Sequence, residues 1–196
     1  MAENVDDVAA CLLATLGAMR PTRLQLLVYY AQAWHLAGHH EHLFDDPIEA
    51  RPDGPVIRRL YDQTRGRDEV DAWPAGDPRR LGSRARGVIE WVLRSYGSFP
   101  DGELSRIARA EAPWRLARQG RLVRRSTKAV DPAVMATYYD RLRASPDTAV
   151  LVAVGSARLE GHEFGPREVD LLRAVAAGTR PADDIVAELT RRYRAS

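Results

Sequence analysis

The sequence predicts an all-α protein, in which a compact helical domain is followed by a small three-helix segment at the C-terminus. Three observations lead to this prediction. Apolar residues recur at positions i, i+3 and i+4 in most of the longer segments, which is the spacing of amphipathic helices. Glycine and proline stand at the ends of these segments rather than inside them. A single short stretch, Pro47 to Ala50, is typical of extended chain because a proline opens it after two aspartates.

The N-terminal third is expected to form two helices. The first covers Val5–Met19, with Asp6 and Asp7 in the first turn, where acidic groups meet the positive end of the helix dipole. Pro21 opens the second helix, which we expect to end near Gly38. The helical spacing of its aromatic residues among aliphatic ones indicates core positions for Tyr29, Tyr30 and Trp34.

The middle of the chain alternates between helices and loops. Gly54-Pro55 is expected to form a turn that opens a helix over Val56–Gln63. Further helices are expected at Ser83–Tyr96, Asp101–Ala110 and Asp131–Ala144, with a loop over Gly66–Gly82, a turn around Pro113–Arg118 and an irregular basic connection over Gly120–Val130.

A boundary is expected at Ser145-Pro146-Asp147. We therefore divide the chain into residues 1–144, called the body, and residues 145–196, called the tail. The tail holds three amphipathic segments, which are Thr148–Gly161, Pro166–Gly178 and Ala182–Tyr193. About 50 residues are few for an independent domain, so the tail is expected to pack on the body or on a partner.

Charge and composition argue against nucleic acid and membranes as partners. The chain has 29 basic and 27 acidic residues among 196, a net charge of +2, which gives no electrostatic footprint for DNA. A solvated loop is expected for the basic run, and binding to operator DNA or to an acidic face of a toxin is the minor alternative. The run consists of Arg121, Arg124, Arg125 and Lys128. The sequence has no signal peptide and no apolar run long enough to cross a bilayer, so we expect a cytoplasmic protein.

No catalytic motif is apparent, and neither an enzyme activity nor a cofactor is expected. The sequence has no glycine-rich phosphate loop, no Gly-x-Ser-x-Gly elbow and no His-Glu-x-x-His pattern. Four histidines, His35, His39, His40 and His42, raise the alternative of a zinc site. They lack a second ligand pair or a cysteine set, so no metal is expected.

The body carries a series of motifs in a fixed order, which are Leu24–Ala37, Leu43–Ala50, Gly54-Pro55-Val56, Tyr96-Gly97, Glu111–Arg115 and Asp131–Tyr139. In this series the body resembles the Panacea antitoxin domain, also called SocA-like or GepA-like. The resemblance covers about residues 5–144. It implies a mostly helical antitoxin domain that occurs with many unrelated toxins, and one family member is described as an adaptor that delivers its toxin to a protease.

The tail contains the pattern Ser/Thr-x-x-x-Glu-Gly at Ser156, Glu160 and Gly161, within the series of short helical segments from Val154 to Tyr193. In both features the tail resembles the VbhA-type antitoxins of Fic enzymes, where this pattern is inhibitory. Residues four apart share a helical face, so Ser156 and Glu160 would project together, while Arg158 lies on another face. The resemblance implies that Glu160 pairs with the arginine that holds the ATP γ-phosphate in a Fic AMP-transferase.

These features together predict an antitoxin that binds and inhibits a Fic-domain toxin. The chain lacks the active Fic signature, His-Pro-Phe followed by Gly-Asn-Gly-Arg, so it would inhibit such an enzyme without being one. The alternative is an adaptor to a protease complex, or an antitoxin for another kind of toxin, with Glu160 a solvated surface carboxylate. Under either hypothesis we expect packing roles for Leu159, Leu171 and Leu172, which are also candidates for toxin contact.

Overall fold

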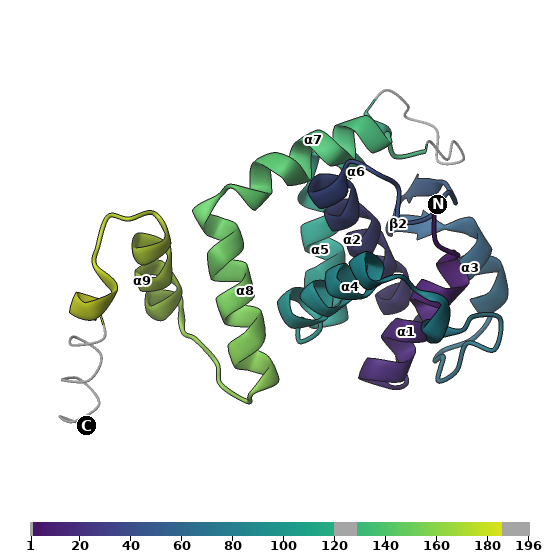
Figure 1. The fold of residues 1–196 in the computed structure, drawn as a ribbon, viewed down its shortest axis with the longest axis horizontal. Helices are drawn as coiled ribbons and strands as arrows, with labels where there is room; N and C mark the ends of the chain where they lie inside the picture. Colours follow the sequence, from purple (N-terminus) through teal and green to yellow (C-terminus); the bar gives the residue numbers. More distant parts are fainter. Residues whose placement is uncertain (1, 120–128, 186–196) are drawn as a thin grey trace.

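The computed structural model describes residues 2–119 and 129–185, and it confirms the all-α fold (Figure 1). Helices make up nearly all of the regular structure, and the strands described form one two-stranded sheet. In the described part of the chain, no helix is both long and apolar enough to cross a membrane. The basic run Arg121, Arg124, Arg125 and Lys128 lies outside the described residues, as does most of the expected last helix, from residue 186 on.

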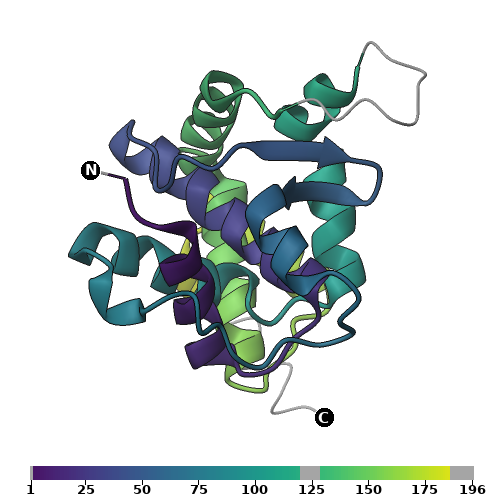
Figure 2. The ribbon, with the colours of Figure 1, turned by 90° about the vertical axis from the view of Figure 1, so that its right-hand side faces the viewer.

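Helix α2 (Pro21–His39) forms the centre of the body (Figure 2). Every residue from Leu24 to Ala37 is buried, because α1 (Val5–Leu16), α4 (Ser83–Tyr96) and α7 (Pro132–Arg143) cover different sides of it. A helix that is apolar on all sides is typical of a central core element. The core positions expected for Tyr29, Tyr30 and Trp34 are confirmed.

The first correction concerns the segment after Ile48. Strands β1 (Ile48–Arg51) and β2 (Gly54–Ile57) form an antiparallel hairpin, and helix α3 (Arg58–Thr64) begins only after it. The expected helix start at Val56 is therefore wrong. The physical reason is the amide of Gln25, which accepts from the Ile57 N–H at 2.8 Å and donates to the Ile57 carbonyl at 3.2 Å, holding β2 extended against α2.

The second correction concerns the segment from Ala112 to Arg118, where a turn was expected and the chain forms helix α6. Pro113 lies in the first turn of this helix, where the missing N–H of proline costs no hydrogen bond. The remaining body elements are the 3₁₀ helix η1 (Pro78–Arg80) and helix α5 (Asp101–Ala110), and α4, α5 and α7 lie where helices were expected.

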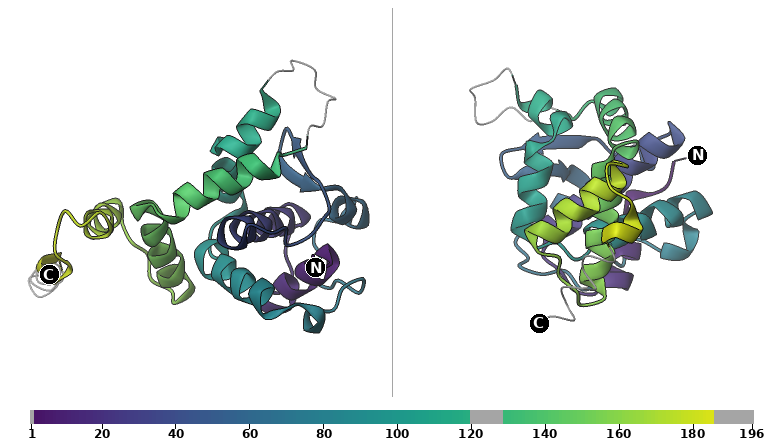
Figure 3. Two further views of the ribbon diagram at one scale, coloured as in Figure 1. Left: turned by 45° about the horizontal axis from the view of Figure 1, so that its top comes forward. Right: turned by 90° about the vertical axis from the view of Figure 1, so that its left-hand side faces the viewer.

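The tail begins with helix α8 (Pro146–Leu159), which packs against α4 (Figure 1). The two helices approach closely at Gly155, where an added Cβ would lie 2.3 Å from the carbonyl oxygen of Arg94. Helix α9 (Pro166–Ala176) packs mainly against α8 and projects away from the body (Figure 3). Since the cluster of buried core residues runs from Val5 to Tyr139, it lies within the body.

This distribution of the core leads to a prediction for a truncated chain of residues 1–144. We expect it to stay soluble and helical, with a lower unfolding temperature because the α8-covered side of α4 becomes exposed. Circular dichroism during a thermal ramp measures both properties. A truncated chain that unfolds without cooperativity would show instead that body and tail share one core.

Candidate toxin-binding site

The residues of the expected inhibitory motif lie at the C-terminal end of α8. Ser156 is half-buried in the last full turn, and Glu160 is the exposed C-cap residue. The Glu160 N–H still bonds back to the carbonyl oxygens of Ser156 at 3.2 Å and Ala157 at 3.1 Å, so position 160 continues the helical path. Among the described residues, the Glu160 side chain has no hydrogen-bond or ion-pair partner.

Gly161 ends the helix and turns the chain away from its axis. Its φ of 82° is in the left-handed region, which glycine adopts at little cost. The Gly161 N–H bonds to the Arg158 carbonyl at 3.1 Å, and the His162 N–H bonds to the Ala157 carbonyl at 2.8 Å. This pair of bonds is the Schellman arrangement of helix C-termini. Gly161 therefore has a structural role that does not depend on any partner.

Arg158 fixes the orientation of this helix end. Its guanidinium lies 3.7 Å from the Glu103 carboxylate and 4.6 Å from the centre of the Phe99 ring. Because two residues along a helix turn it by about 200°, positions 158 and 160 lie on different sides of α8. Arg158 contacts the body, and Glu160 is exposed. Arg158 is thus a packing residue of α8, and its replacement would disturb the helix itself. The exposed Glu163 is therefore the better position for a control substitution that is expected to have no effect.

The three candidate leucines of the tail differ in exposure. Leu159 is 49 % exposed, next to Glu160, and so is open to a partner. Leu171 and Leu172 are half-buried in α9, which packs against α8. The structure therefore brings Leu159 together with the motif at the end of α8, whereas Leu171 and Leu172 belong to the following helix.

The histidines occupy two small hydrogen-bonded arrangements. His35 Nδ1 lies 2.9 Å from the Glu41 carbonyl, and its ring centre is 4.7 Å from that of His39. His42 Nδ1 lies 3.1 Å from the amide nitrogen of Gln32. Burial lowers the pKa of His35, so the neutral ring is favoured. Within residues 2–119 and 129–185, no three His, Cys, Asp or Glu side chains are grouped as metal ligands.

Sequence reasoning missed a buried acid in the body. Glu111 lies between α5 and α6 and accepts a hydrogen bond of 2.5 Å from the Tyr139 hydroxyl. Tyr29, Tyr30 and Tyr96 complete an aromatic cluster around Tyr139, in which the Tyr30 and Tyr96 rings stack at 3.9 Å. Burial raises the pKa of Glu111 to about 8, although the Tyr139 hydrogen bond acts in the opposite direction.

Comparison with known proteins supports the assignment of the body. Residues 24–115 match the model of the family described as Antitoxin SocA-like, Panacea domain. No curated protein matched the chain, and no solved structure matched it. The matched segment runs from the start of the central helix α2 through Glu111 and Trp114, whose indole N–H donates to the Arg51 carbonyl at 3.1 Å. The match supports a general role as an antitoxin, with a toxin as partner.

Proposed function

We propose that this chain is the antitoxin of a Fic-type AMP-transferase toxin, with the body holding the toxin and the tail blocking its nucleotide site. The observation that carries the proposal is the exposed Glu160 at the end of α8, which has no hydrogen-bond or ion-pair partner among the described residues. A carboxylate held at the end of a packed helix is positioned before the partner arrives, which lowers the ordering cost of binding.

The chemistry follows from the charge of the two partners. The Glu160 carboxylate would form a bidentate pair with the arginine that a Fic enzyme uses for the ATP γ-phosphate. It would also repel the phosphate. Transfer of AMP requires accurate positioning of the nucleotide, so a small displacement of ATP stops the reaction. Ser156 lies one turn before Glu160, where its hydroxyl is placed to bond near the nucleotide site or to orient Glu160.

A second function is favoured by a separate finding, which is that the family match covers the body and not the tail. An antitoxin that neutralises a non-Fic toxin by direct binding, or an adaptor that brings its toxin to a protease complex, needs only the body. The gene next to this one distinguishes the two proposals, because a Fic reading frame supports inhibition by Glu160.

The test in cells expresses the toxin with variants of the chain and measures growth. Wild type is expected to restore growth, and Glu160→Gly to fail, because the charge and the reach of the side chain are both lost. Glu160→Gln keeps the shape but replaces charge-assisted bonds by neutral ones of about half the strength, so partial rescue is expected.

The matched control is Glu163→Gly, which removes a second exposed glutamate three residues away. This variant should restore growth as wild type does. Full rescue by Glu160→Gly would contradict inhibition at the nucleotide site and would favour neutralisation by the body.

A further inference from the structure

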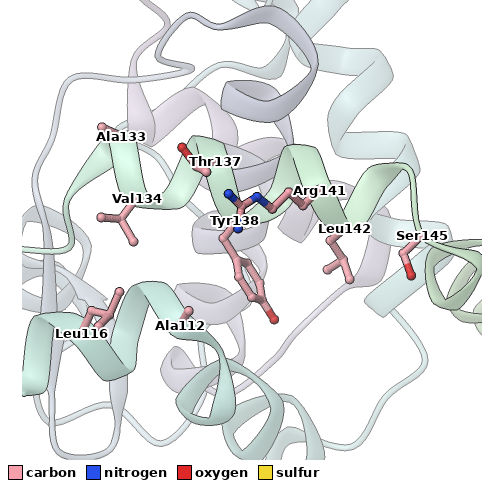
Figure 4. Close-up of a pocket in the computed structure, with 9 residues that line it drawn as sticks. All are labelled: Ala112, Leu116, Ala133, Val134, Thr137, Tyr138, Arg141, Leu142 and Ser145. Carbon is pink, nitrogen blue, oxygen red and sulfur yellow. The ribbon is translucent and has the colours of Figure 1, made fainter.

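Helix α7 presents two different faces. Met135 and Tyr139 are buried against the core of the body. A neighbouring face of α7 borders an open groove of about 650 Å³ between α6 and α7 (Figure 4). In that view Leu116 of α6 faces Val134 of α7 across the groove. Leu116 is 50 % exposed and lies beside other apolar side chains of the lining, so it belongs to a continuous apolar surface. Residues of α6 and α7, with Ser145 beyond the end of α7, line the groove. They are Ala112, Leu116, Ala133, Val134, Thr137, Tyr138, Arg141, Leu142 and Ser145.

The groove carries one charge. Arg141 is the only charged residue in the lining, and its side chain has no hydrogen-bond or ion-pair partner among the described residues. The neighbouring Arg143, in contrast, pairs with Asp140 at 3.6 Å. Since no carboxylate lines the groove, an apolar partner with an acidic group near Arg141 would complement both its surface and its charge.

The shape of the groove favours an elongated partner. The α7 residues in the lining recur at helical spacing from Ala133 to Leu142, which corresponds to roughly 14 Å along the helix axis. Helix α6 covers only part of this length, since it contributes Ala112 and Leu116, one turn apart. An apolar stripe of between two and three turns matches the apolar face of another helix better than it matches a compact small molecule.

We propose that the α6–α7 groove is the docking site for an amphipathic helix of the toxin, which places its apolar face on Leu116, Val134 and Tyr138 and a carboxylate against Arg141. This inference rests on the proposed antitoxin function and names the part of the body that holds the toxin. It is independent of the action of Glu160, because the groove and the end of α8 are formed by different elements.

The test measures binding of the full-length chain to the toxin that the neighbouring gene encodes, prepared as an inactive variant. Leu116→Asp is expected to weaken binding about 10-fold or more, because it puts a charge into the apolar contact. Arg141→Glu is expected to weaken binding to a similar extent, and Arg141→Lys to keep most of it. The unfolding temperature should not change, since both side chains are exposed.

Two control variants make the outcome decisive. Tyr61→Asp changes another exposed apolar residue, on α3, and should bind as wild type. Leu159→Asp changes a leucine of similar exposure beside Glu160. Normal binding by Leu116→Asp together with lost binding by Leu159→Asp would overturn the groove and keep the proposed function. A wild-type dimer that Leu116→Asp dissociates would assign the groove to a second copy instead. A wild-type chain that binds no toxin would overturn both proposals.

Discussion

The Glu111→Gln variant is expected to keep its free energy of unfolding as the pH rises from 4.5 to 8.5, while wild type loses several kcal/mol more than the variant over this range. Burial raises the pKa of Glu111 from 4.5 to about 8 in the folded chain. Folding therefore favours the protonated acid. The stabilisation is complete below pH 4.5, where both states are protonated, and it is lost as the pH rises through about 8.

The expected size follows from the two pKa values. A difference of one pKa unit corresponds to about 1.4 kcal/mol, so a shift of this size amounts to about 5 kcal/mol at full ionisation. Gln cannot ionise, and its carbonyl oxygen still accepts the bond from Tyr139. Urea unfolding of both proteins at a series of pH values measures the difference. Parallel curves for wild type and variant would show that Glu111 ionises in the folded state as it does in the unfolded chain.

Replacing Asp6 by Ala is expected to lower the free energy of unfolding by about 1–3 kcal/mol, the usual cost of leaving a buried donor, here the Trp73 indole N–H, without its acceptor. The Asp6 side chain is 1 % exposed and accepts from the Trp73 indole at 3.0 Å, the Gln63 amide at 2.9 Å and the Arg59 guanidinium. These bonds join α1 to α3 and to the segment that contains Trp73.

The matched control for this variant is Asp68→Ala, because Asp68 is exposed. A surface substitution of this kind should change the free energy of unfolding by less than about 0.5 kcal/mol. Chemical denaturation of the three proteins at one pH gives the comparison. An Asp6→Ala variant as stable as the control would mean that water replaces the lost carboxylate without cost.

Much of the fold could be predicted because its signals are local. The apolar spacing from Leu24 onward placed α2, and Pro132 with the capping Asp131 placed the start of α7. The errors arose where tertiary contacts decide the local structure. The Gln25 side chain bonds to Ile57 at the end of strand β2, where the sequence predicts a helix. Pro113 lies in the first turn of helix α6, where the sequence predicts a turn.

The buried polar network could not be predicted from spacing. The local sequence predicts a solvated Asp6 in the first turn of a helix. Its hydrogen-bond partners, however, lie 53 to 67 residues further along the sequence. In the sequence, Glu111 is recognisable only as part of a family motif. The tyrosines around it come from α2, α4 and α7, so its burial depends on tertiary packing. For the tail motif, the spacing did predict that Ser156 and Glu160 lie within one helical turn, because that prediction needs only local geometry.

AMP transfer from labelled ATP by the purified Fic toxin, measured together with a pull-down, tests the central claim most directly. With the chain and the toxin at equal concentration, wild type is predicted to suppress AMP transfer. Glu160→Gly is predicted to be retained by the toxin as wild type is, because the rest of the interface is unchanged, and yet to leave AMP transfer at the level of the toxin alone. Complete suppression of AMP transfer by Glu160→Gly would contradict the account.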